Sequence, residues 1–186
     1  MEVSMKITTL GKVFNRVDEL SQNCFDQNVN VQDITFENLD SVNIAGESHP
    51  LRTIAQRSIT WRLGIPFQYL RKCSPEIQSV NLNYWIEHEK NEQLFFRMDG
   101  QDVRAIFTPK YKPVDNFEIC ERLDSMGHKP ATQVQCSLDP EFMSLSILDG
   151  KKSFDINGDK FRPGISISEK VPAGNSIRKS KLLDRA

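Results

Sequence analysis

The dipeptide Asp99-Gly100 constrains the fold most, because it separates two short runs in which apolar and polar residues alternate. One run covers residues 94–98 and the other residues 103–107. Asp-Gly between two such runs is typical of the tight turn of a β-hairpin. The sequence therefore predicts a hairpin near the middle of the chain.

The same alternation predicts which side chains of the first strand reach the core. Successive side chains of a strand point to opposite faces of the sheet. We therefore expect Leu94, Phe96 and Met98 on one buried face. Phe95 and Arg97 are expected on the other face, away from this apolar trio.

Four segments have the residue spacing of helices, namely 10–17, 50–63, 75–86 and 115–126. Pro50 suits the first turn of the second helix, and Ser74 suits the N-cap of the third. The third helix is apolar around much of its circumference, so we expect it at the centre of the core. Gly127 fits the end of the fourth helix.

Short strands are predicted within 29–36 and at 132–138, 142–148, 154–156 and 161–168, the last two joined by a turn at Asn157-Gly158. Helices followed by consecutive antiparallel strands indicate a single domain of the α+β class, with a largely antiparallel sheet. We expect an acidic, partly ordered segment at 1–49, the α+β core at 50–168 and a basic, flexible tail at 169–186.

Charge alternates in blocks along the chain, although 24 basic and 25 acidic side chains give a formal net charge of −1. Residues 51–72 carry five basic side chains and no acidic one, and residues 97–112 carry four basic and two acidic ones. The last 36 residues carry nine basic and four acidic side chains. The basic blocks could gather into one patch or pair with the acidic blocks, and the sequence leaves both outcomes open.

The chain lacks the short motifs of common catalytic and nucleotide-binding sites: it has no GxxxxGK[ST], GxGxxG, GxSxG or HExxH. Four cysteines without a CxxC pair and three histidines do not have the spacing of a zinc site. Asp99 and Asp102 flank the predicted turn and are expected to serve it rather than a metal ion. We therefore predict no catalytic residue, no cofactor and no metal, which argues against an enzyme.

No run of about 18 apolar residues and no secretory signal is present, so we expect no membrane association. The cysteines are then expected to be reduced thiols in the cytoplasm.

Residues 97–116 are the most informative stretch for binding, because a basic strand pair leads into the loop Lys110-Tyr111-Lys112 between two prolines. Cations beside an exposed aromatic ring are what phosphate neutralisation and base stacking require. A solvated hairpin whose tyrosine packs on its own prolines explains the stretch at least as well. The candidate nucleic-acid-binding residues are Arg57, Arg62, Arg97, Arg104, Lys110, Tyr111 and Lys112.

Several phrases of the chain resemble the phage/plasmid-like protein family, whose members occur mainly in phages, prophages and plasmids and have no established activity. The phrases are Leu63-Gly64-Ile65-Pro66 with Tyr69, Asn81-Leu82-Asn83, Arg97, Val103-Arg104-Ala105-Ile106, Lys110-Tyr111, Val114-Asp115-Asn116 and Phe161 with Pro163-Gly164-Ile165-Ser166-Ile167. The resemblance covers residues 50–168, and Asp115 and Asn116 enter the candidate surface through it. The resemblance implies a mobile-element context and, with it, the cytoplasm of a bacterial host cell.

The chain departs from the family pattern in two places. Thr108-Pro109-Lys110-Tyr111-Lys112 stands where the family more often has Ser-Asp-Arg-Tyr-Arg, so the charge is kept but the acid is lost. After residue 168 the usual Asn-Ser-Glu-Val-Gly phrase is missing, so the chain resembles either a shortened member or one whose tail replaces the usual C-terminal half. We expect the basic stretch Arg178-Lys179-Ser180-Lys181 to be a flexible or interacting arm.

Two functions from different classes remain open. The first is a phage- or plasmid-associated, non-enzymatic protein that binds DNA or RNA through 51–72 and 97–112 in replication, recombination or defence evasion. The alternative is a protein-interaction module, such as an inhibitor of a host defence factor, that binds a host or phage protein. A nucleotide-acting enzyme with Arg97, Lys110 and Asp115 around a pocket is less favoured, because no acid–base pair is visible.

Overall fold

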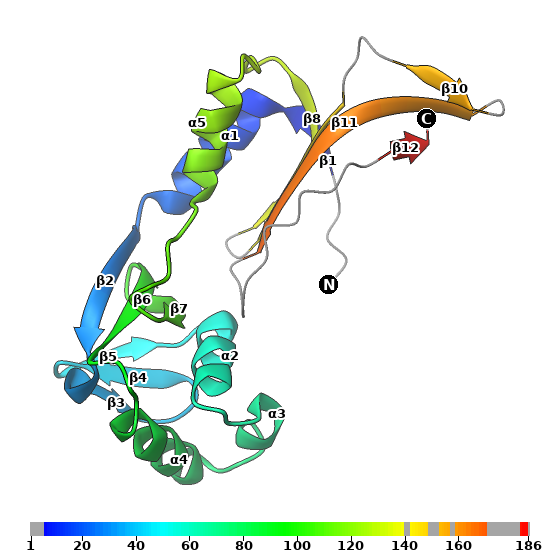
Figure 1. The fold of residues 1–186 in the computed structure, drawn as a ribbon. Coiled ribbons are helices and arrows are strands. Elements are labelled where there is room, and N and C mark those ends of the chain that lie inside the picture. The colour runs from blue at the N-terminus through cyan, green and yellow to red at the C-terminus, as the bar shows by residue number, and fades with distance from the viewer. Residues whose placement is uncertain (1–5, 140–141, 149–152, 157–158, 171–182, 186) are drawn as a thin grey trace. The chain divides into compact units, whose positions relative to one another are not determined.

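The computed structural model describes residues 6–139, 142–148, 153–156, 159–170 and 183–185 (Figure 1). These residues form two compact units. The central unit is residues 21–113, and the split unit comprises the described residues of 6–20 and 114–170 with the strand 183–185. Neighbouring strands in the described sheets are antiparallel, which confirms the expected α+β class.

The central unit contains two three-stranded sheets, ordered β2–β6–β7 and β3–β4–β5, together with helices. Its elements are β2 (Cys24–Asn30), the 3₁₀ helix η1 (Val31–Asp33), β3 (Ile34–Phe36), β4 (Ser41–Ile44), β5 (Glu47–Pro50), α2 (Thr53–Arg62), α3 (Phe67–Leu70), α4 (Pro75–Glu87), β6 (Gln93–Asp99) and β7 (Asp102–Phe107).

The hairpin predicted around Asp99-Gly100 is confirmed as β6 and β7, with Gly100 at a positive φ of 58°. Leu94, Phe96 and Met98 are fully buried, and they share a core with apolar residues of α2. Arg97 lies on the opposite face of the sheet, as its position in the strand predicts.

Residues 21–49, expected as part of a partly ordered acidic segment, form β2 to β5 in the central unit. β2 pairs with β6 along its whole length, from Cys24 opposite Asp99 to Asn30 opposite Gln93. The division into 1–49 and 50–168 therefore differs from the units of the structure, because this pairing joins segments about 70 residues apart. The chain passes from the central unit to the split unit after Pro113, so the expected core at 50–168 contains residues of both units.

The start of the second predicted helix is wrong by three residues. Pro50 is the last residue of β5, where it lies opposite Ser41, and α2 begins at Thr53. Pro at a strand end and Pro at a first helical turn both avoid the need for an N–H donor, so the residue alone does not distinguish the two. The third helix begins as predicted, with Ser74 as N-cap and Pro75 at its first position.

α4 is joined to β3 and the loop after it by side chains that bind main-chain atoms. Asn83 accepts a 2.7 Å hydrogen bond from the N–H of Phe36 and donates a 2.9 Å bond to its carbonyl oxygen. Ser79 donates to the same carbonyl, and Gln78 accepts a hydrogen bond from the N–H of Leu39. These bonds orient α4 in the central unit.

The split unit contains a sheet ordered β1–β8–β9–β11–β10, with β12 paired to β11, and two helices whose apolar residues share a buried cluster with this sheet. Its elements are β1 (Lys6–Thr9), α1 (Leu10–Ser21), α5 (Asn116–Ser125), β8 (Gln133–Asp139), β9 (Phe142–Leu148), β10 (Phe154–Ile156), β11 (Asp159–Lys170) and β12 (Leu183–Arg185).

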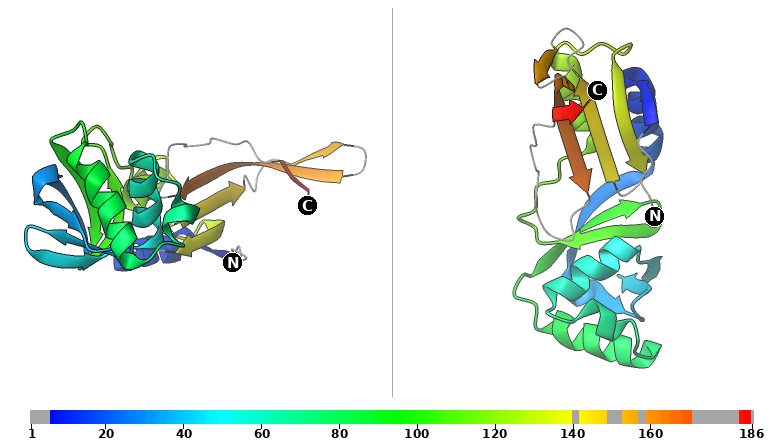
Figure 2. Two further views of the ribbon diagram at one scale, coloured as in Figure 1. Left: turned by 90° about the horizontal axis from the view of Figure 1, so that it is seen from below. Right: turned by 90° about the vertical axis from the view of Figure 1, so that its right-hand side faces the viewer.

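β11 is longer than its neighbours and pairs with three strands. Residues 164–170 pair with β9, whereas residues 159–163 continue beyond β9 and pair with β10 and β12 (Figure 2). The Asn157-Gly158 turn lies outside the described residues, as does most of the expected flexible tail at 169–186, including Arg178-Lys179-Ser180-Lys181.

Leu82 and Val80 on α4 offer a matched test of which side of this helix stabilises the fold. Leu82 is fully buried and Val80 is 69% exposed. We expect Leu82→Ala to lower the free energy of unfolding by about 3 kcal/mol, because it leaves a cavity in the core. Val80→Ala should change it by less than about 0.5 kcal/mol. Urea unfolding followed by circular dichroism measures both, and similar values for the two variants would contradict the assigned orientation of α4.

Candidate functional site

Arg52, the residue before α2, holds the turn of the β6–β7 hairpin. Its Nη2 lies 2.9 Å from Oδ2 of Asp99, and its Nε donates a 2.9 Å hydrogen bond to Oδ2 of Asp102. Nδ1 of His49 lies 3.0 Å from the carbonyl oxygen of Gln101 in the same turn. The two aspartates thus bind a cation of the chain itself, which agrees with their expected role in the turn.

Arg97 is buried in an ion pair. Its side chain is about 6% exposed, and its Nε lies 3.1 Å from Oδ1 of Asp26 on the neighbouring strand β2. Asp26 is the residue directly opposite Arg97 in the strand register. A guanidinium so deeply buried and already paired is not presented to a phosphate backbone.

Arg104 is the extra residue of a β-bulge, because Arg97 pairs with Ala105 while Met98 pairs with Val103. Its Nη1 lies 3.0 Å from Sγ of Cys24 on β2. Burial raises the pKa of the Cys24 thiol above its ordinary value of 9.0, although the Arg104 guanidinium opposes the rise. The thiol therefore lacks the lowered pKa of an activated nucleophile.

The ring of Tyr111 stacks on an aromatic residue of the β2–β6–β7 sheet. Its ring centroid lies 4.0 Å from that of Phe107, with 19° between the planes, and 6.0 Å from that of Phe95. Lys110 and Lys112 on either side are exposed. The loop therefore presents two lysines around a tyrosine whose ring already packs on an aromatic residue.

The two candidate arginines of α2 also have partners within the central unit. The guanidinium carbon of Arg57 lies 5.0 Å from the centre of the Phe67 ring. Nη2 of Arg62 lies 2.7 Å from Oε1 of Glu89, and both side chains are largely buried. Burial opposes ionisation of Glu89, but hydrogen bonds from Arg62 and Asn91 hold its pKa below the ordinary value of 4.5.

The candidate residues are therefore divided among several surroundings. Arg97 and Arg104 come together on one face of the β2–β6–β7 sheet, where Asp26 and Asp99 accompany them. α2, which carries Arg57 and Arg62, packs on the opposite face of this sheet. Asp115 and Asn116 belong to the split unit, where Asp115 is the N-cap residue and Asn116 begins α5.

An apolar strip on the outer side of α4 is the feature that the sequence interpretation missed. It consists of Ile77, Val80, Tyr84 and Trp85, which are 47%, 69%, 54% and 46% exposed. We call these four residues the α4 stripe. They were expected in the core, but only Leu82 and Ile86 of the helix's apolar residues are buried there.

The α4 stripe has an aromatic end. The rings of Tyr84 and Trp85 meet edge to face at 5.2 Å between centroids, and the ring of His88 lies 4.7 Å from that of Tyr84. Nδ1 of His88 donates a 2.7 Å hydrogen bond to the carbonyl oxygen of Tyr84. The three rings form an exposed cluster at the C-terminal end of the helix.

The inner face of α4 carries polar side chains that form hydrogen bonds with the main chain. For this reason the apolar pattern of the sequence did not predict the orientation of the helix. Gln78, Ser79 and Asn83 point toward the main chain of β3 and the loop after it, and so occupy part of the buried face. The available signal was the position of these three side chains beside Leu82 and Ile86 on the helix. Their partners, the N–H and carbonyl groups of Phe36 and the N–H of Leu39, lie about 40 residues earlier in the chain and have no sequence pattern.

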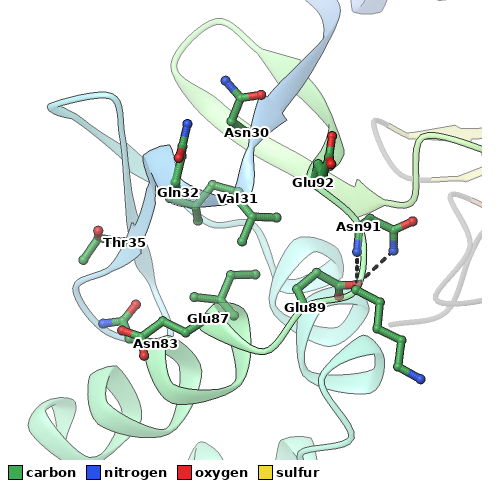
Figure 3. A pocket seen from close by; sticks show the side chains of 12 residues that line it. Asn30, Val31, Gln32, Thr35, Asn83, Glu87, Glu89, Asn91 and Glu92 are labelled. Carbon is green, nitrogen blue, oxygen red and sulfur yellow. Dashed lines mark hydrogen bonds between the residues drawn. The ribbon is translucent and has the colours of Figure 1, made fainter.

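A pocket of about 820 Å³ lies beside the C-terminal end of α4 (Figure 3). Its lining includes the apolar side chains of Val31, Ile34 and Ile86. Carboxylates and amides surround them, and Figure 3 shows these side chains around the hollow, contributed by the end of β2, η1, α4 and the loop after α4. The polar residues of the lining include Asn30, Gln32, Glu87, Glu89, Asn91 and Glu92.

Among the described residues, no group of three or more His, Cys, Asp and Glu side chains is arranged to hold a metal ion. In the same part of the chain, no helix combines the length and apolar character needed to cross a bilayer. All four cysteines are free thiols.

Comparison of the chain with protein-family models, with curated proteins and with solved structures finds no match.

The Arg62–Glu89 pair yields a pH-dependent prediction. Arg62→Met leaves a buried carboxylate without its cation, and should lower the free energy of unfolding at pH 7 by about 3 kcal/mol. Because folding lowers the pKa of Glu89, the stabilisation by the pair is complete above pH 4.5 and disappears as the pH falls through the folded-state value.

The destabilisation caused by Arg62→Met should therefore shrink on acidification below pH 4.5, as measured by urea unfolding at several pH values. Arg71→Met, at an exposed arginine, is the control and should change stability by less than about 0.5 kcal/mol at every pH. A destabilisation that is the same at pH 7 and pH 3.5 would contradict this assignment.

Proposed function

We propose that this chain is a non-enzymatic protein-interaction module that binds another protein through the α4 stripe. The observation that carries the proposal is the exposure of two aromatic and two aliphatic side chains on consecutive turns of one helix. Single exposed apolar residues are normal on protein surfaces, but contiguous ones are typical of interaction sites. Tyrosine and tryptophan are also enriched among the residues that dominate binding energy.

The pairing of the basic side chains favours this function over nucleic-acid binding. Arg52, Arg62 and Arg97 each have a carboxylate within 3.1 Å, so their charge is neutralised inside the central unit. Binding of nucleic acid draws its affinity from cations that replace counterions on phosphates. Three arginines of the two proposed basic blocks are committed to other partners.

The resemblance to the phage/plasmid-like family supports a mobile-element setting for this interaction. A small module without catalytic motifs suits an inhibitor of a host factor or a component of a phage assembly. Both would act in the cytoplasm of a bacterial host.

Truncating the aromatic end of the stripe tests the proposal. Tyr84→Ala and Trp85→Ala should each weaken partner capture about 30-fold, as expected for residues at the centre of an interface. Neither should change the melting temperature by more than about 2 °C, since both side chains are about half exposed. Purified full-length variants are immobilised, exposed to nuclease-treated bacterial lysate, and the captured proteins quantified by mass spectrometry.

Phe117→Ala provides the matched control. Phe117 is an aromatic residue of helix α5 that is 49% exposed, close to the values of Tyr84 and Trp85. It should leave capture unchanged. Equal capture by all three variants and the unaltered chain would contradict the proposed function.

Nucleic-acid binding is a second candidate, because Lys110 and Lys112 are exposed on either side of Tyr111. It predicts that a 20-nucleotide single strand binds at low salt, with a salt-dependence slope that falls by about 1.4 in Lys110→Ala/Lys112→Ala, or about 0.7 for each phosphate that is no longer neutralised. Mobility-shift titrations across salt concentrations measure the slope, with Lys129→Ala as the control at another exposed lysine. Absence of binding at low salt would eliminate this candidate.

A further inference from the structure

We infer that the partner presents a cationic side chain, best an arginine, next to the apolar residues that cover the α4 stripe. This inference rests on the proposed function and names the chemistry of the surface that α4 recognises. Three features of the C-terminal end of α4 support it: the charge of the helix end, the exposed aromatic rings and the lining of the adjacent pocket.

The C-terminal end of α4 concentrates negative charge. The C-terminal end of a helix carries a partial negative charge from its aligned peptide dipoles, which basic side chains commonly offset. The last turn of α4 has no basic residue and instead carries the exposed carboxylate of Glu87. An external cation at this end would offset both the helix dipole and this carboxylate.

The pocket extends this negative region beyond the helix. Glu92, which is exposed, lines the same hollow as Glu87 (Figure 3). Glu89 contributes less, because Arg62 and Asn91 already bind its carboxylate. Among the described residues that line the pocket, Lys90 is the single basic one, so the carboxylates of Glu87 and Glu92 outnumber it.

The aromatic end of the stripe also attracts cations. The faces of aromatic rings carry partial negative charge, and a guanidinium stacks on them more readily than an ammonium group does. Tyr84 and Trp85 are both about half exposed. Tyr84 is three residues before Glu87, so a ring and a carboxylate are neighbours on the same side of the helix.

A protein segment fits this surface better than a free small cation does. Ile77 and Val80 continue the stripe away from the charged end along α4, with 47% and 69% of their surface exposed. A small cation would leave them uncovered. A segment with apolar side chains and one arginine would cover the stripe and place the guanidinium beside Glu87, in the hollow that Glu92 also lines.

The test selects peptides from a random library of 12-residue sequences on the immobilised full-length chain. We expect the enriched sequences to share an arginine flanked by apolar residues. A synthetic peptide of the enriched sequence, and its counterpart with citrulline in place of the arginine, are then titrated by calorimetry. Citrulline keeps the shape and removes the charge, so the citrulline peptide should bind about tenfold more weakly.

Variants of the chain, titrated with both peptides, complete a double-mutant cycle. Glu87→Gln/Glu92→Gln should weaken the arginine peptide about tenfold and leave the citrulline peptide unchanged. Glu121→Gln, at an exposed glutamate of α5, should affect neither peptide. Circular dichroism melting of each variant verifies that the fold is retained.

The outcomes separate the inference from the proposed function. Enriched peptides without a basic residue, whose binding is abolished in Tyr84→Ala, would overturn the inference and leave the proposed function standing. No enriched peptide, or enrichment that is equal on Tyr84→Ala/Trp85→Ala, would overturn both. Self-association of the chain that disappears in Val80→Glu would overturn the cationic partner in favour of a second copy.

Discussion

The apolar face of the β6–β7 hairpin is the surface on which the central unit is assembled. Leu94, Phe96 and Met98 are fully buried on this face, and apolar residues of α2 belong to the same core. β2 pairs with the other edge of β6 and brings Asp26 opposite Arg97. A two-stranded hairpin is marginal in water without such packing, so the helices and the hairpin depend on each other.

Three arginines of the basic segments form ion pairs with carboxylates within the central unit. Arg52 binds the two aspartates of the hairpin turn, Arg62 binds Glu89, and Arg97 binds Asp26. Each of these three arginines binds a carboxylate from another segment of the chain, so its charge is neutralised inside the central unit. The interaction surface that we propose for the central unit rests on apolar exposure on α4 rather than on net charge.

Local signals predicted much of the fold, and long-range pairing accounts for what they missed. The hairpin at Asp99-Gly100, the start of α4 at Ser74-Pro75 and the end of α5 near Gly127 follow from turn and cap chemistry within a few residues. Most of β2 was missed, since the strands predicted within 29–36 include only its last two residues, and its partner β6 lies about 70 residues further along the chain.

The candidate site was predicted less well than the fold. Residue type identified arginines able to bind phosphate, but whether each was free depended on carboxylates distant in sequence, such as Asp26 for Arg97. The α4 stripe was assigned to the core because a helix apolar on most sides gives no direction of burial. That direction is set by the hydrogen bonds of Gln78 and Asn83, whose acceptors and donors are main-chain groups.

Because the hydrogen bonds that orient α4 go to main-chain groups, they do not depend on the side chains of the segment beneath the helix. The amides of Gln78 and Asn83 recognise the peptide groups of residues 36 and 39, which every amino acid except proline supplies in the same form. The strand and loop under the helix can therefore change side chains, within the limits of packing, while the hydrogen bonds that orient the helix are kept. Selection acting on the outer surface of α4 can then proceed almost independently of drift in the segment that supports it.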